Sequence, residues 1–163
     1  MINLMTERTH DLFALTALTV AFILMPLTEI SLITLIVSVI VNQIGSAIPD
    51  LDQPTAEFYR ELPAGSLIGK LVSPLLGSHR LISHSLLGMG IVGYVINLVL
   101  EYLSNYLTAD INIIWWAFIL GYLSHLVADS LTKEGVPWLF PLPIKIGFPP
   151  FEYSAHQSTA FRP

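Results

Sequence analysis

Four long apolar segments dominate this chain of 163 residues. They cover residues 12–28, 30–49, 81–100 and 111–128, and none of them contains Lys, Arg, Asp or Glu. A helix needs about 20 apolar residues to cross a bilayer, with a range of about 17–25. The pattern therefore predicts an all-α, polytopic membrane protein with four transmembrane helices in a single membrane domain.

The composition excludes an ordinary soluble domain. Only 12% of the residues are charged and 53% are hydrophobic, whereas a soluble domain carries about 25% charged residues. The chain contains no cysteine. A bound metal would therefore need His, Asp, Glu or backbone oxygen as ligands.

The basic residues predict the orientation of the chain. The connections after the first and third apolar segments contain no Lys or Arg, so all seven basic residues belong to the other side of the membrane. The positive-inside rule makes that side cytoplasmic and predicts that both termini lie inside.

Two further regions are expected on the cytoplasmic side. Residues 64–76 form an apolar stretch too short to span, which favours a short interfacial helix between the second and third spans. Residues 135–163 are rich in Pro, Gly and aromatic residues and are expected to form a cytoplasmic tail.

Histidines and aspartates gather at the predicted cytoplasmic ends of all four spans. His125 and Asp129 lie four residues apart, so a helix would place them on one face. Ionised side chains at the end of a membrane helix cost free energy unless a partner compensates them. The other members of this layer are His10, Asp50, Asp52, His79 and His84.

Neutral imidazoles and ionised carboxylates that converge on one point are suitable ligands for a divalent cation. Zinc fits this ligand set best, and manganese and iron are alternatives. The expected metal ligands are His10, Asp50, Asp52, His84, His125 and Asp129.

Each residue taken alone also has a structural explanation. His10 fits the start of an interfacial helix, Asp50 and Asp52 fit a helix stop followed by a turn, and His79 fits a loop. Ser85, next to His84, would suit a serine nucleophile, but the other signals all concern metal ligands. The complete set is harder to explain by structure than any one member.

The motifs around these residues resemble a known family. The motifs are Thr-x-x-Thr-His ending at His10, Ile-Pro-Asp-Leu-Asp at 48–52, His-Arg-x-x-Ser-His-Ser-Leu at 79–86, and the segment from Gly121 to Pro137. In order and spacing they are similar to the bacterial LexA-regulated, membrane-bound metal-dependent hydrolase family of inner-membrane proteins. Gln53 and Leu81 depart from the residues common in that family, His and Gly respectively.

The resemblance implies metal-dependent hydrolysis in the bacterial inner membrane, with these His and Asp residues as the metal site. A site at the headgroup level favours a phosphoester or ester of a membrane lipid as the substrate, much as in soluble zinc phospholipases. His79, His84 and Asp52 are the expected catalytic residues. Arg80 is suited to hold a phosphate oxygen by a charge-assisted hydrogen bond, and it fits equally well as a basic anchor on the cytoplasmic side. The expected partners are the bilayer and a lipid substrate, with no nucleic acid.

A non-enzymatic function is the competing hypothesis. Intramembrane His and Asp also line proton and metal-ion transport paths, and a membrane scaffold could hold a structural metal. A transporter should carry polar groups through the whole membrane depth. The outer halves of the spans look apolar, with Asn97 as the main polar interruption, which favours a one-sided site.

Overall fold

The computed structural model describes residues 7–25, 30–52, 82–106, 108–132, 135–142 and 144–147. These residues form helices and contain no β-strand, only an isolated bridge between Val136 and Ile146. The predicted all-α class is therefore confirmed for the described part of the chain. The helices are α1 (Glu7–Leu24), α2 (Leu32–Ala47), the short 3-10 helix η1 (Ile48–Asp52), α5 (Leu86–Leu103) and α6 (Ile111–Ser130).

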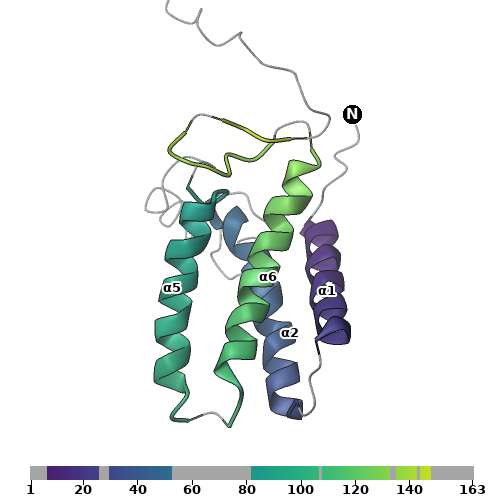
Figure 1. Ribbon diagram of the computed structural model, residues 1–163, viewed down its shortest axis with the longest axis vertical. Helices are drawn as coiled ribbons and strands as arrows, with labels where there is room; N and C mark the ends of the chain where they lie inside the picture. The colour runs from purple at the N-terminus through teal and green to yellow at the C-terminus, as the bar shows by residue number, and fades with distance from the viewer. Residues whose placement is uncertain are drawn as a thin grey trace, which may run out of the picture.

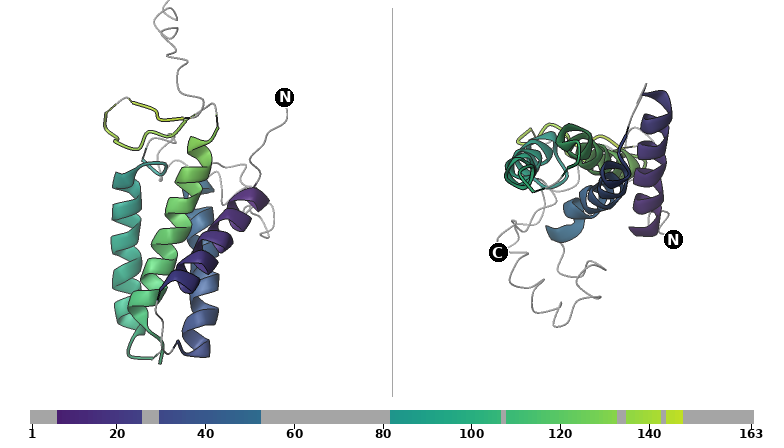
Figure 2. Two further views of the ribbon diagram at one scale, coloured as in Figure 1. Left: turned by 45° about the vertical axis from the view of Figure 1, so that its right-hand side comes forward. Right: turned by 90° about the horizontal axis from the view of Figure 1, so that it is seen from below.

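The helices form a bundle in which α6 is the central member. It packs on α2, α1 and α5, whereas α5 contacts chiefly α6 (Figure 1). Successive helices run in opposite directions, and α1 crosses the others at an angle (Figure 2). The starts of α1 and α5 consequently lie at the same end of the bundle as η1 and the end of α6. We call this end the site end.

Three of the helices are long and apolar enough to cross a membrane. They are Leu32–Leu51, which includes η1, Leu86–Leu103 and Ile111–Ser130. The predicted first span, 12–28, corresponds to α1, which begins earlier and carries Glu7, Arg8 and Asp11 in its 18 residues. The membrane-protein prediction is supported, while the count of four spans stays a prediction.

The third helix starts later than the apolar pattern indicated. Ser85 has an extended backbone, and its side chain accepts a hydrogen bond from the Gly88 amide at 3.1 Å. It is therefore the N-cap of α5, and a cap ends the helix on its N-terminal side. α5 therefore begins at Leu86, within the predicted span 81–100, and His84 lies in the turn before the helix rather than inside it.

Small residues allow α2 and α6 to approach closely. A Cβ atom added at Gly121 would collide with the backbone carbonyl of Asn42, and one added at Gly45 would collide with that of Phe118. The buried Asn42 side chain donates a hydrogen bond to the Ala117 carbonyl at 2.9 Å. Close backbone contact with interhelical hydrogen bonds is a common way to pack helices in lipid. This contact brings the ends of α2 and α6 together at the site end.

The end of the bundle opposite the site is closed by helix caps. Ser31 caps α2 and Asp110 caps α6, each by accepting a hydrogen bond from a backbone amide three residues on. The Asp110 amide donates in turn to the Thr34 hydroxyl at 3.0 Å, which joins the two caps. These polar groups thus satisfy the free amides of two neighbouring helix starts.

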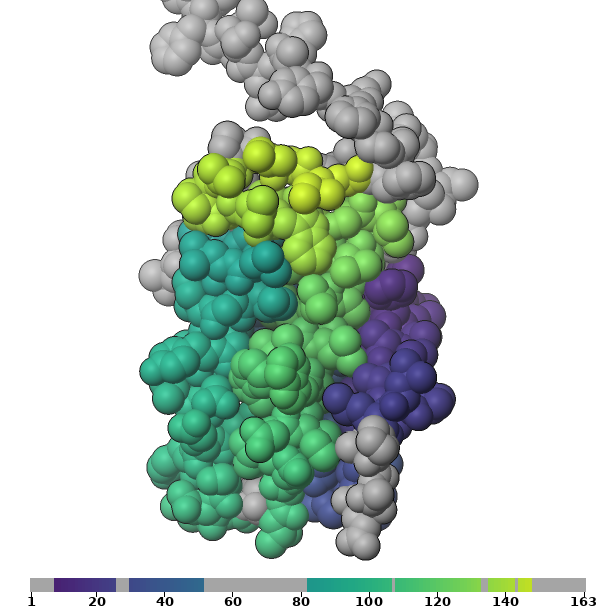
Figure 3. Space-filling view, viewed as in Figure 1, coloured from purple at the N-terminus to yellow at the C-terminus, as the bar shows by residue number. Residues whose placement is uncertain are grey.

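Residues 135–142 and 144–147, which we call the cap, fold back over the site end. Val136 is buried with Phe118, Tyr122 and Leu126 of α6, and it pairs with Ile146 through two hydrogen bonds of 2.9 Å. This part of the predicted tail is packed against the bundle, and Figure 3 shows it (yellow-green) lying on α5 and α6. The predicted interfacial helix at 64–76 falls outside the described residues.

Candidate metal centre

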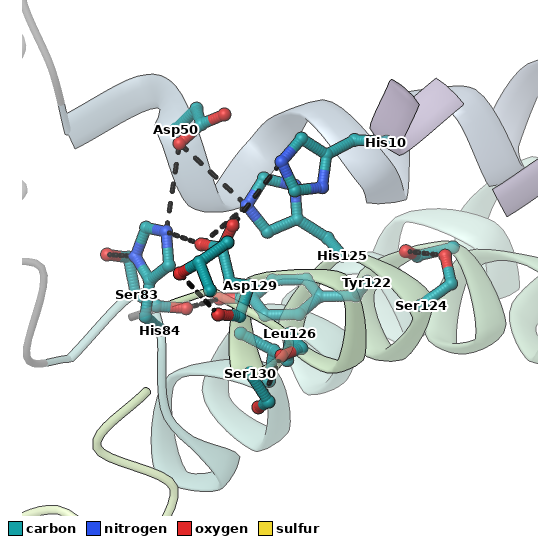
Figure 4. Close-up of polar contacts among 12 residues, drawn as sticks. His10, Asp50, Ser83, His84, Tyr122, Ser124, His125, Leu126, Asp129 and Ser130 are labelled. Atoms are coloured by element: carbon teal, nitrogen blue, oxygen red, sulfur yellow. Dashed lines mark hydrogen bonds and ion pairs between the residues drawn. The ribbon is translucent and has the colours of Figure 1, made fainter. Parts of the chain in front are cut away.

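Five predicted ligands come together at the site end from four different elements. His10 lies near the start of α1, Asp50 in η1, His84 in the turn before α5, and His125 and Asp129 on α6 (Figure 4). Because successive helices run in opposite directions, the starts of α1 and α5 and the ends of α2 and α6 all lie at the site end.

The Asp129 carboxylate lies at the centre of the group. Its Oδ1 atom is 3.3 Å from His10 Nε2, and its Oδ2 atom is 3.3 Å from His84 Nε2 and 3.5 Å from His125 Nε2. One carboxylate therefore contacts three imidazoles, with its two oxygens directed to different partners.

Asp50 completes the group on the opposite side. Its Oδ1 atom lies 3.7 Å from His84 Nε2 and 3.8 Å from His125 Nε2. Two carboxylate oxygens and two imidazole nitrogens thus alternate around one point. The three ligand atoms of Asp50, His84 and His125 lie within 4.8 Å of one another, as do those of His10, His125 and Asp129.

The spacing of these atoms fits a metal better than it fits hydrogen bonds. Hydrogen bonds of N–H to O mostly fall at about 2.7–3.2 Å, whereas the five contacts here measure 3.3–3.8 Å. Ligands about 2.0–2.1 Å from a tetrahedral zinc ion are about 3.3–3.4 Å apart. The four-atom arrangement of Asp50, His84, His125 and Asp129 can close around such an ion with small adjustments.

The burial of His125 also indicates a metal site. Its side chain is 1% exposed, and neither of its ring nitrogens has a hydrogen-bond partner among the described residues. A buried polar atom without a partner costs about 1–3 kcal/mol. The Nε2 atom of His125 faces the Asp50 and Asp129 carboxylates. A cation bound among these three groups would give Nε2 a partner and would also offset the free-energy cost of burying the two carboxylates.

The imidazoles are held by contacts that the protein makes around them. His10 stacks on His125 with ring centroids 4.1 Å apart and an angle of 17° between the planes. The Tyr122 hydroxyl, one turn before His125, donates a hydrogen bond to the Ser83 carbonyl at 2.5 Å. The Ser83 hydroxyl lies 3.1 Å from His84 Nδ1. Outer contacts of this kind orient the ligands of metal sites.

The electrostatics of the centre favour a positive charge. Burial would lower the pKa of His84, but its contacts with Asp129 and Asp50 outweigh burial and raise the pKa to about 9. A metal ion that bound at His84 Nε2 would displace this proton and serve the same two carboxylates.

The structure does not place every predicted site residue. His79 and Arg80 lie outside the described residues, and Asp52 ends η1 but its side chain is also outside them. Ser85 is buried, donates a hydrogen bond to the Ile82 carbonyl at 2.6 Å and caps α5. These structural roles account for Ser85 without a nucleophile.

The sequence pattern did not identify the buried polar residues on α2. They are Thr34, Ser38, Asn42 and Ser46, spaced four residues apart on the face that leads to Asp50, and each is at most 1% exposed. The expectation that the outer halves of the spans are apolar was therefore wrong for this helix. The spacing of four was visible in the sequence, but small hydroxyl side chains are easily overlooked in an apolar run. Asn97, by contrast, lies on α5 and donates a hydrogen bond to Glu101 at 2.7 Å.

Comparison with known proteins places the chain in a family. The sequence profile described as YdjM inner membrane protein matches residues 5–161, nearly the whole chain. The chain belongs to the YdjM inner membrane protein family.

One curated relative in Bacillus subtilis (strain 168), named "Uncharacterized protein YvsG", is 31% identical over 106 residues. The aligned region covers 65% of this chain and 58% of that protein, so the chain spans little more than half the length of this relative. No solved structure matches the chain. Family membership agrees with the three helices that are long and apolar enough to cross a membrane. Residues 5–161, which the family profile matches, include all five residues of the centre described above.

Proposed function

We propose that this member of the YdjM family is a membrane-bound, metal-dependent hydrolase that cleaves a phosphoester or ester of a membrane lipid. The observation that carries the proposal is the convergence of His10, His84 and His125 on the Asp129 carboxylate, with Asp50 on the opposite side, at one end of the helix bundle.

The residues that would hold the metal are Asp50, His84, His125 and Asp129. His10 contacts the second oxygen of Asp129 and would stabilise that carboxylate or take part in a second ligand set. Zinc suits this combination of nitrogen and oxygen donors, and manganese or iron are alternatives. A bound divalent metal would supply a Lewis acid and would lower the pKa of a coordinated water.

The protein itself would exclude solvent and orient the substrate. His125 and His84 are buried, whereas Asp50 and Asp129 remain partly accessible at the end of the bundle. A substrate would therefore approach the carboxylate side. In this proposal His79 and Asp52 carry out proton transfers, His84 acts as a metal ligand through Nε2, and Arg80 contacts a phosphate oxygen.

The location of the centre supports a lipid substrate. His84 lies two residues before the membrane-spanning α5, and Asp129 is the penultimate residue of α6. Both residues therefore lie close to the level where lipid headgroups meet the hydrocarbon layer. The basic residues predict that this is the cytoplasmic side of the inner membrane, with both termini inside.

A second candidate, transport of protons or metal ions, is favoured by the polar residues of α2. The hydroxyls of Ser38 and Ser46 are buried and have no hydrogen-bond partner among the described residues, as would be expected if water bound there. Between them, however, Asn42 packs directly against the Gly121 backbone. A close contact at this depth would interrupt a hydrated path. A scaffold with a structural metal is the remaining alternative.

The test uses protein reconstituted into vesicles of defined phospholipids, with the metal removed by a chelator and then restored. Release of phosphate-bearing headgroups identifies a phosphoester substrate, and release of fatty acid identifies an ester. Hydrolysis should require the metal and should disappear in Asp129→Asn, with Asp110→Asn as the matched acidic control. Metal-bound protein that hydrolyses neither bond contradicts the proposal. Metal-ion or proton flux across the same vesicles would instead support the transporter.

A further inference from the structure

The cap carries exposed aliphatic side chains although its backbone is firmly held. Leu139, Leu142, Ile144 and Ile146 are each 49–53% exposed within a short segment. Scattered apolar residues on a surface need no explanation, but several together mark an interaction site. The question is which partner covers them.

Three contacts fix the cap to the bundle, and a fourth closes the cap on itself. Val136 is buried in the core, and Val136 pairs with Ile146 to close the loop. The Trp138 indole nitrogen donates a hydrogen bond to the Ser130 hydroxyl at 2.8 Å, and the Leu86 amide donates to the Trp138 carbonyl at 3.1 Å. The exposed residues are therefore displayed on a supported loop.

The apolar surface of the cap continues into the lipid-facing surface of α5. Leu86 and Leu87, at the start of α5, are 41% and 47% exposed, and Leu86 is hydrogen-bonded to the cap. Figure 3 shows the cap resting on the end of α5 without a break. A surface continuous with a membrane-spanning helix, at the level where that helix begins, lies at the membrane boundary.

The charge and the aromatic residues of the cap fit the same partner. Lys145 is exposed between Ile144 and Ile146, so a cation is placed among the aliphatic side chains. Trp138 is partly buried, with its nitrogen bonded to Ser130. Trp is enriched at membrane interfaces, and basic residues near the surface are attracted to anionic headgroups by about 1 kcal/mol each.

We propose that the cap docks onto the headgroup layer of the bilayer, with its aliphatic side chains inserted beside anionic lipids. The inference goes beyond the proposed hydrolase, because it holds whether the metal centre is catalytic or structural.

The docked cap would lie directly beside the metal centre. Trp138 contacts Ser130, which follows Asp129, and Leu86, which lies two residues from His84. The lipid surface and the site are thus joined through one residue, by the Trp138 indole to Ser130 and by its backbone carbonyl to Leu86. A lipid in the adjoining leaflet would reach the carboxylate side from within the membrane rather than from water.

The absence of cysteine allows single nitroxide labels to be placed at will. The labels go on Leu142→Cys and Leu139→Cys, with Leu98→Cys on the lipid-facing surface of α5 and Asn105→Cys in the exposed turn after α5 as references. Collision with oxygen and with a water-soluble nickel complex then reports depth in vesicles containing anionic phospholipid.

The proposal predicts that both cap labels shift from the accessibility of Asn105→Cys toward that of Leu98→Cys. Replacing the anionic lipid by a zwitterionic one, or introducing Lys145→Glu, should move them back toward water. Cap labels as accessible to nickel as Asn105→Cys would overturn the proposal. So would labels shielded from both reagents, which would mean that protein covers the cap. Metal content measured on the same samples keeps this result separate from the hydrolase hypothesis.

Discussion

The polar residues at the two ends of the helix bundle differ in their contact distances and in their hydrogen bonding. At the end opposite the site, Ser31, Thr34 and Asp110 are joined by hydrogen bonds of 2.8–3.2 Å that cap α2 and α6. At the site end, five His and Asp side chains approach one another at 3.3–3.8 Å. There His125 has no hydrogen-bond partner on either ring nitrogen among the described residues.

The difference separates polar residues that complete a structure from polar residues arranged for a ligand. Capping groups meet backbone amides at optimal distances, and nothing further is needed to stabilise them. Carboxylates and imidazoles that are buried together at longer distances need a charge between them. Substitutions at the two ends should therefore have different consequences.

The largest expected effect is the loss of metal when the central carboxylate is neutralised. Asp129→Asn keeps the shape of the side chain but removes the charge that contacts three imidazoles, so metal affinity should fall by more than about 100-fold. The measurement is elemental analysis and metal titration of the purified protein. Asp110→Asn, at the other end, should lower thermal stability by about 1 kcal/mol or less and retain the full metal content. Equal metal contents in the two variants would remove the distinction between the ends.

A smaller loss of metal affinity is expected when His10 and His125, which stack on each other in the centre, are substituted one at a time. His125 Nε2 contacts both Asp50 and Asp129, whereas His10 Nε2 contacts only Asp129 among the carboxylates that the structure describes. His125→Gln should therefore weaken metal binding more than His10→Gln, for which we expect a loss of about 10-fold. Titration of the metal-free variants with zinc measures both values. An equal loss of zinc affinity in both variants would mean that His10 binds the metal as directly as His125 does.

The smallest effect on the metal is expected from the helix contact that positions the centre. Gly121→Ala places a methyl group against the Asn42 backbone, and overpacking of this kind costs about 1–3 kcal/mol. Gly90→Ala on α5 meets no described atom within 4 Å and should change stability by about 1 kcal/mol or less. Thermal unfolding measures the difference, and a modest loss of zinc affinity should accompany Gly121→Ala only. If both variants are equally stable, the α2–α6 contact is looser than the structure indicates.

Much of the candidate centre was predictable from residue types and the alternation of the spans. A chain that crosses the bundle repeatedly returns alternate helix ends to one side, so His10, Asp50, His84, His125 and Asp129 were expected at one level. Local backbone events were harder to predict. Ser85 is the N-cap residue of α5, so the helix starts after His84. The hydrogen bond from the Gly88 amide to the Ser85 side chain sets this start, although the apolar pattern begins earlier.

The role of the α2 polar residues also depended on the fold. In sequence, Thr34, Ser38, Asn42 and Ser46 are minor interruptions of a hydrophobic run. The fold turns them toward α6, where Asn42 can donate to the Ala117 carbonyl. The folded-back cap was likewise missed, because its attachment depends on the long-range bonds from Trp138 to Ser130 and from Leu86 to Trp138.

The order of residue types along the chain is enough to predict that it enters the membrane and that histidines and aspartates gather at one side of the membrane. Both follow from hydrophobicity and from the direction of successive helices, which are properties of the chain taken segment by segment. The position of Asp129 between three imidazoles, with Asp50 opposite, follows instead from how the helices pack. That arrangement requires α2 and α6 to touch through Gly45 and Gly121, and distances of a few ångströms between separate helices are set by how their surfaces pack.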